Sequence, residues 1–257
     1  MFVDNNYVVC YTLVMDKIDF EYKINSSAYN ESFARYLVER VYVPEFKYAS
    51  VQDKPDIWNT ATNHGIEVTT LTNTYYNTLN RYRRVWAEKK LTLEQIIKQQ
   101  PTLLKGKLGI NKHGNIILLN LTDGKKSVAR SQKGLASTVA LKLRKLKNYE
   151  EFATTDLFIF APDLHGACTT NHIKDAIYNI EKLTNVKLNM FDKLYDNILV
   201  FTYTNLIVVP FKEKTAIKVI NVTPEDRDYC DKFANIAMEK SEKNRKQLKN
   251  KELEQEL

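Results

Sequence analysis

The sequence predicts an α/β protein with a central mixed β-sheet flanked by helices. Segments rich in β-branched and aromatic residues, typical of strands, recur between segments whose apolar residues have helical spacing. The chain has 257 residues, of which 44% are hydrophobic and 27% charged, and this globular composition excludes a disordered or fibrous protein. It contains only 7 glycines and 6 prolines, which argues against a β architecture built from repeated turns.

Strands are expected where β-branched and aromatic residues cluster between turn residues. In chain order, the expected strands and extended runs are Tyr7–Met15, Lys17–Ile24, Lys54–Trp58, Ile66–Leu71, Lys107–Ile110, Asn115–Leu121, Asp156–Ala161, Ile198–Tyr203, Leu206–Phe211 and Ala216–Asn221. The first two form a pair. The segments on either side of Lys112–Gly114 form a hairpin, since glycine is a typical residue of tight turns.

Helices are expected where apolar residues recur at intervals of three and four. These segments are Tyr29–Val41, Thr74–Lys90, Leu91–Gln99, Ser127–Tyr149, Thr169–Leu183 and a final helix from Thr223. Ser26 and Ser27 supply capping side chains for the first helix, and Pro44 follows its end. We expect residues 1–222 to form a single domain and residues 223–257 to form a trailing charged helix.

The cysteines and the N-terminus favour a cytoplasmic protein. Cys10, Cys168 and Cys230 are far apart and odd in number, so a disulfide framework is not expected. The N-terminus has no basic region before its apolar stretch, which argues against a secretory signal. No apolar stretch is long enough to span a bilayer, so no membrane association is expected.

Positive charge is concentrated in the middle of the chain. The net charge is +7, but the segment from Arg81 to Glu150 contains 17 basic and 4 acidic residues, and the rest of the chain is therefore net acidic. Such a segment is suited to neutralising phosphates, with release of counterions. The alternative is a set of solvated helix faces, since charge distribution alone discriminates weakly.

Two acidic residues near the start of the chain have the spacing of a metal site. Asp56 follows Pro55, and Glu67 lies eleven positions later in the expected strand Ile66–Leu71. A hairpin-like return would bring both carboxylates to the same end of adjacent strands, where they suit a hard divalent cation. In strand geometry Glu67 and Thr69 share one face. The alternative is that Asp56 is a turn residue and that Glu67 is a strand residue in a salt bridge.

These residues resemble the motif of the PD-(D/E)XK nuclease superfamily, which has a restriction-endonuclease-like fold. In that family a proline-aspartate and a Glu-x-Lys strand bind magnesium and activate water for phosphodiester cleavage. The resemblance covers Tyr29 to Ala161 and matches Pro55, Asp56 and Glu67. It implies Mg²⁺ or Mn²⁺ as the cofactor and DNA as the substrate. The chain departs from the family at Thr69, where a threonine stands in place of the motif lysine.

Lys142 is the candidate replacement for that lysine. On the helix after Lys133, a rotation of about 100° per residue puts the apolar residues on one stripe and Lys142 beside it, while Arg144, Lys145 and Lys147 turn away. Lys142 is therefore the basic residue of this helix best aimed at the sheet. The alternative is snorkelling, in which the stem covers apolar surface and the amine stays in water.

Three further residues are candidates for the site. Glu31 and Glu39, on the first helix, are candidate additional metal ligands, because related folds often add an acidic residue from this helix. Glu39 is as readily explained as a surface ion-pair partner one turn from Arg35. His64 precedes Glu67 and has the alternatives of a phosphate contact or a plain turn residue.

Nucleic-acid contacts are expected along the basic segment. Aromatic residues interleave with arginines in the helix Thr74–Lys90, a mixture suited to base stacking and phosphate contact, although the same aromatics share one helical stripe and are equally explained as core. The residues expected to bind nucleic acid are Arg81, Arg83, Arg84, Lys133 and Lys145.

The sequence thus predicts a metal-dependent nuclease that cleaves DNA, with Asp56, Glu67, Thr69 and Lys142 at the catalytic centre, and with a setting in bacterial or phage defence. The alternative is a catalytically silent module of the same fold that binds nucleic acid or a protein partner. Homodimerisation, or a protein contact through the C-terminal helix, is a further expectation.

Overall fold

The computed structural model describes residues 26–71, 95, 98, 108–110, 116–118, 124–149, 151–164 and 168–255. The expected strand pair in residues 7–24 and helix in residues 74–90 lie outside this part of the chain, as does nearly all of the expected helix in residues 91–99. So do the candidate nucleic-acid-binding residues Arg81, Arg83 and Arg84. Within the described residues, no helix combines the length and apolar character needed to cross a membrane.

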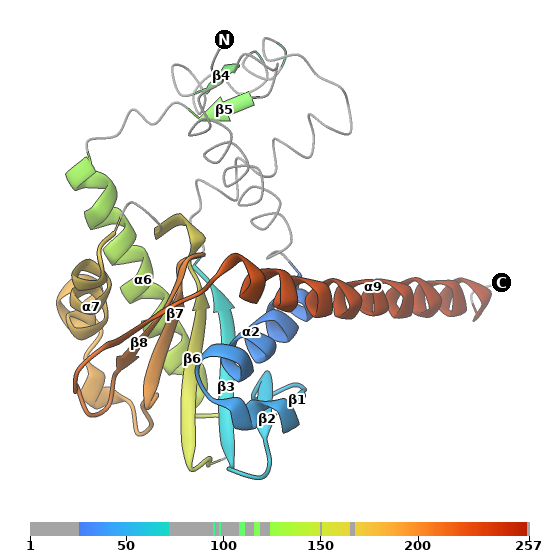
Figure 1. The fold of residues 1–257 in the computed structure, drawn as a ribbon, viewed down its shortest axis with the longest axis horizontal. Helices are drawn as coiled ribbons and strands as arrows, with labels where there is room; N and C mark the ends of the chain where they lie inside the picture. Colours follow the sequence, from blue (N-terminus) through green and yellow to red (C-terminus); the bar gives the residue numbers. More distant parts are fainter. Residues whose placement is uncertain are drawn as a thin grey trace.

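The described residues form an α/β structure around a mixed sheet (Figure 1). Its strands are β1 (Ser50–Val51), β2 (Ile57–Asn59), β3 (His64–Thr70), β6 (Thr154–Phe160), β7 (Asn197–Phe201), β8 (Asn205–Pro210) and β9 (Lys218–Asn221). The helices are α2 (Ser27–Val41), α6 (Gly124–Leu146), α7 (Thr170–Tyr178), α8 (Ile180–Thr184) and α9 (Pro224–Gln255). This confirms the predicted central mixed sheet with flanking helices.

The sheet has seven strands in the order β1-β2-β3-β6-β7-β8-β9. Strands β3, β6 and β7 are parallel at its centre, and antiparallel pairs extend it at both ends. A separate antiparallel pair, β4 (Leu108–Ile110) with β5 (Ile116–Leu118), confirms the predicted hairpin pairing.

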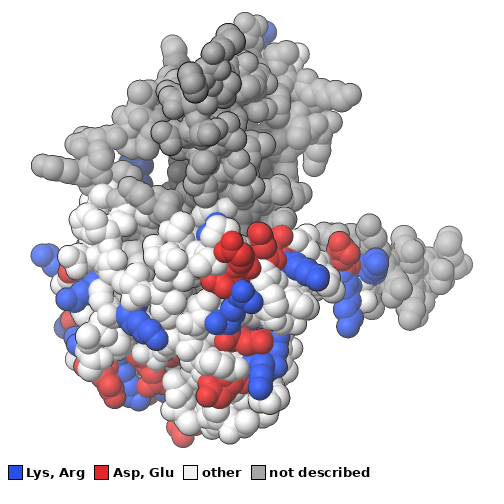
Figure 2. All heavy atoms as spheres, viewed as in Figure 1, with Lys and Arg blue, Asp and Glu red and all other residues white. Residues whose placement is uncertain are grey.

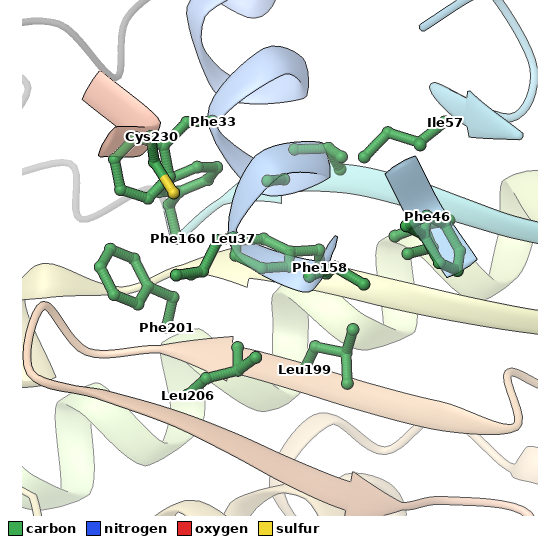
Figure 3. Packing of buried hydrophobic residues seen from close by; sticks show 14 of the residues in the cluster. Phe33, Leu37, Phe46, Ile57, Phe158, Phe160, Leu199, Phe201, Leu206 and Cys230 are labelled. Carbon is green, nitrogen blue, oxygen red and sulfur yellow. The ribbon is translucent and has the colours of Figure 1, made fainter. Parts of the chain in front are cut away.

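Both faces of the sheet are covered, and the central strands alternate between the two resulting cores. On β6, Phe158 and Phe160 pack with α2 and α9, whereas Leu157 and Ile159 pack with α6, α7 and α8. Figure 3 shows the first of these cores, where side chains from the sheet meet Phe33 and other residues of α2. Burial on both faces explains why β6 reads in the sequence as a continuous apolar run.

The helix boundaries differ from the predicted ones at α6 and at the segment that forms α7 and α8. Helix α6 begins and ends three residues earlier than predicted, so that Tyr149 lies just beyond its last turn. The single helix predicted at Thr169–Leu183 is divided into α7 and α8, because Asn179 has a non-helical backbone conformation and its side chain donates to the Asp175 carbonyl at 2.8 Å.

Helix α9 is only partly a trailing element. Its first turns pack on α2, with Cys230 and Ala234 fully buried in the core and Tyr29 donating to the Asp231 carboxylate at 2.6 Å. Beyond Met238 the helix extends away from the body (Figure 1). The beginning of α9 is therefore part of the same packed unit as the sheet.

Candidate functional site

The antiparallel pairing of β2 with β3 brings Asp56 and Glu67 together. Ile57 pairs with Ile66, so the same register continued by one residue sets Asp56 opposite Glu67. Directly opposed residues in such a pair have Cα atoms about 4.5–5.5 Å apart and side chains on the same face. Asp56 is also tied to β3, because its Oδ2 accepts the Val68 N–H at 2.6 Å.

The alternation along β3 directs Glu67 toward α6. Ile66 and Val68 belong to the core beneath α2 and α9. Glu67 and Thr69 lie on the other face, where their partners on β6 are Leu157 and Ile159, two residues of the core beneath α6. Glu67 and Thr69 therefore share one face, as predicted from the strand period.

Both carboxylate oxygens of Glu67 are engaged by side chains, one from α6 and one from the residues just after it. Lys142 forms an ion pair with Oε1, and the Tyr149 hydroxyl donates to Oε2. The Lys142 amine also lies 3.4 Å from the Val68 carbonyl oxygen. Since the Lys142 side chain is only 14% exposed and its amine contacts Glu67, the snorkelling interpretation does not describe this lysine.

Asp56 and Glu31 have raised pKa values because they are partly withdrawn from water and lie close to other carboxylates. Burial and then the Glu67 charge raise the pKa of Asp56 to about 6, despite the opposing effects of the Val68 N–H and Lys142. On α2, burial and then Asp56, Glu67 and Asp53 raise the pKa of Glu31 to about 7. Such mutual repulsion is the electrostatic condition that favours binding of a cation.

Two tyrosines complete the surroundings of Lys142 and Glu67. Burial, followed by the hydrogen bond to Glu67, raises the pKa of Tyr149, and burial raises that of Tyr195. Tyr195 is fully buried and its hydroxyl donates to the Lys142 carbonyl at 3.4 Å. Neither tyrosine was predicted from the sequence to lie at the site. Tyr149 lies beyond the last turn of α6, so helical phase alone did not indicate its direction.

Glu39 and His64 lie away from Glu67. Glu39 forms an ion pair with Arg35 at 3.6 Å, as in the ion-pair alternative, although both side chains are partly buried, and it is Glu31 that interacts with Asp56. His64 is on the α2 side of β3, where its Nε2 lies 2.9 Å from Asp156 Oδ2. The structure therefore brings together Asp56, Glu67, Lys142 and Glu31, but not Glu39 or His64.

Helix α6 presents a basic outer face next to this site. It contains seven lysines and arginines and no acidic residue. Four of the basic side chains are exposed, and within the described part of the chain none of them forms an ion pair: Arg130, Lys133, Arg144 and Lys145. On the face of the molecule shown in Figure 2, by contrast, acidic and basic side chains are interspersed. The exposed face of α6 is therefore a basic surface among the residues that the structure describes.

The donor set of the site suits a hard divalent cation. Asp56 and Glu67 offer carboxylate oxygens and Val68 offers a carbonyl oxygen near the Lys142 amine, all of them ligand types that Mg²⁺ and Mn²⁺ accept. Among the described residues, no group of three or more His, Cys, Asp or Glu side chains is arranged to hold a metal ion. A cation at this site would accordingly rely on two carboxylates, with water or phosphate completing its coordination.

The chain matches no family model, no curated protein and no solved structure. Its function therefore has to be inferred from the chemistry of the site.

Proposed function

We propose that this protein is a metal-dependent nuclease with a restriction-endonuclease-like core that hydrolyses phosphodiester bonds in DNA. The observation that carries the proposal is the contact of Lys142 with Glu67, beside Asp56. A positive side chain is thereby available next to two carboxylates, although position 69 is a threonine. Phosphoryl transfer develops charge on the non-bridging oxygens, and a fixed cation in a site of low polarity stabilises that charge.

In this proposal each residue has a separate role. Asp56 and Glu67 hold the divalent ion, which would supply Lewis-acid stabilisation and a more acidic bound water. Lys142 supplies the positive charge that the phosphate requires. Thr69 lies two residues from Glu67 on the same face, where its hydroxyl can only offer a hydrogen bond. Glu31, on α2, lies close enough for burial and the two carboxylates to raise its pKa to about 7, and a bound cation would favour its ionised form.

The exposed basic face of α6 supports DNA as the substrate. Its arginines and lysines have no acidic neighbours on the helix, so they are available to phosphates. Lys145 follows Lys142 by three residues, which sets it on a neighbouring part of the helix surface. Contacts of this kind bind the phosphate backbone without reading sequence.

A cleavage assay with a matched pair of variants tests the proposal. Supercoiled plasmid is incubated with the protein and Mg²⁺ or Mn²⁺, and Glu67→Ala is expected to abolish nicking while retaining most DNA binding. Glu213→Ala removes an exposed acid from the loop before β9 and is expected to cleave like the wild type. Cleavage that survives Glu67→Ala would assign the activity to another site or to a contaminant.

The engagement of both Glu67 oxygens favours a second candidate function. A glutamate held by Lys142 and Tyr149 is electrostatically satisfied without a metal, as expected of a silent module that binds nucleic acid or a protein partner. The projecting end of α9 would then serve as a contact for a partner or a second copy (Figure 1). Salt-sensitive DNA binding without cleavage under any divalent metal would favour this function over the nuclease.

A further inference from the structure

The two contacts of Glu67 limit how a cation reaches it. Glu67 is 4% exposed, with Lys142 at Oε1 and Tyr149 at Oε2. A carboxylate oxygen has lone pairs for more than one partner, but two positive ions on one buried carboxylate repel each other. Binding of a divalent cation to Glu67 therefore conflicts with at least one of the present contacts.

The Lys142 contact is the one that conflicts. The Tyr149 hydroxyl is neutral, and it remains a compatible donor to Oε2 when positive charge arrives at the other oxygen. The main chain of Tyr149 is held in addition, because its carbonyl accepts from Lys193 at 2.9 Å. Lys142, in contrast, is an ammonium at the oxygen that a metal would share, and its other contact in the site, to the Val68 carbonyl, is long at 3.4 Å.

The Lys142 amine can also move away from Glu67. Its side chain is 14% exposed, whereas the Glu67 side chain is 5% exposed. A lysine stem has four rotatable bonds, so the amine can move toward water or toward a bound anion while the helix stays in place.

We infer that Lys142 is an exchangeable counter-ion of Glu67: it neutralises the carboxylate in the metal-free protein and gives it up when a divalent cation binds, which releases the amine for the phosphate of the substrate. This inference rests on the proposed function. It adds that the same lysine stabilises the metal-free site and weakens metal binding, so that metal affinity is set by competition with a residue of the chain.

The test measures Mn²⁺ affinity by calorimetry in the absence of DNA. Lys142→Met removes the competing charge and is expected to tighten Mn²⁺ binding about tenfold or more, which matches the strength of close charge pairs in protein interiors. Lys147→Met removes the same charge from an exposed position just after α6 and is expected to leave the affinity within about twofold of the wild type.

A second measurement uses the wild-type protein, so that it does not depend on the folding of a variant. Lysines are acetylated with an N-hydroxysuccinimide ester, with and without Mn²⁺, and the extent at each position is read by mass spectrometry. Mn²⁺ is expected to increase acetylation of Lys142 and to leave that of Lys147 unchanged.

The outcomes separate this inference from the proposed function. The inference about Lys142 is overturned if the wild type binds Mn²⁺ but Lys142→Met binds it no more tightly. It is also overturned if Mn²⁺ fails to increase acetylation of Lys142. In both cases the nuclease proposal stands. If neither the wild type nor Lys142→Met binds Mn²⁺, both are overturned.

Discussion

Replacing Asp56 with asparagine is expected to stabilise the metal-free protein at alkaline pH. Burial and the Glu67 charge raise the pKa of Asp56 from 3.8 to about 6. The folded state therefore favours the protonated acid, so that folding becomes less favourable as pH rises through this interval. Asparagine resembles the neutral acid and can still accept the Val68 N–H, so Asp56→Asn removes the electrostatic cost and keeps the hydrogen bond.

The expected gain depends on pH. A pKa raised from 3.8 to about 6 corresponds to about 3 kcal/mol when the acid is fully ionised at pH 8. By the same linkage the gain falls to about 1 kcal/mol at pH 4.5, where the unfolded chain is mostly ionised but the folded protein is not. Urea unfolding monitored by circular dichroism at the two pH values measures the difference.

Asp192→Asn is the matched control, because Asp192 is exposed and its replacement is expected to change stability by less than about 0.5 kcal/mol. Added Mn²⁺ is expected to raise the stability of the wild type and not that of Asp56→Asn, since only a metal that binds the folded state stabilises it. A loss of stability in Asp56→Asn at pH 8, or a gain of the same size at both pH values, would refute this electrostatic description of the site.

Two other predictions concern surfaces and core. Reversing the charge of Lys133 and Lys145 together is expected to weaken binding to any DNA sequence about equally and to reduce the salt slope by about two, measured by fluorescence anisotropy between 50 and 300 mM salt; an unchanged slope would exclude α6 as the interface. His64→Ala is expected to destabilise the protein by about 3 kcal/mol in urea unfolding, because Asp156 is fully buried and would lose one of its partners. A loss below about 1 kcal/mol would mean that the remaining hydrogen bonds of Asp156, from Asn197, satisfy the carboxylate.

The sheet and its helices were predictable because local periodicity and global packing agree. Strand β6 is a short apolar run bounded by polar residues, and it lies at the centre of the sheet between two other central strands. The extent of burial on α9 was not predictable in the same way. The sequence of this helix is dominated by lysine and glutamate, and the side chains of α9 described as fully buried, Cys230 and Ala234, lie in its first turns. A short buried segment at the start of a long polar helix contributes little to the average hydrophobicity of that helix.

The side chains around Glu67 were predictable to different degrees. Asp56 and Glu67 are close because β2 and β3 pair antiparallel. Such a pair is recognisable in a sequence as turn residues between two extended segments. Lys142 could be predicted from helical phase, since a residue beside the apolar stripe is carried toward the sheet when the stripe packs on it. Tyr149 could not, because it lies beyond the end of α6 and its direction depends on the chain after the helix.

Because the positive charge is on α6 and not on β3, its position at the site depends on how α6 packs against the sheet. A lysine two residues after a strand glutamate shares its face through the period of the strand alone. Lys142 reaches Glu67 only if α6 packs on the sheet at the observed height, which Leu135, Val139 and Leu143 secure through the core shared with β6 and β7. A substitution that shifts this packing by one turn, about 5.4 Å, would carry the amine out of reach of the carboxylate. The charge at the site is therefore determined by the hydrophobic core beneath α6 as much as by the residues that carry it.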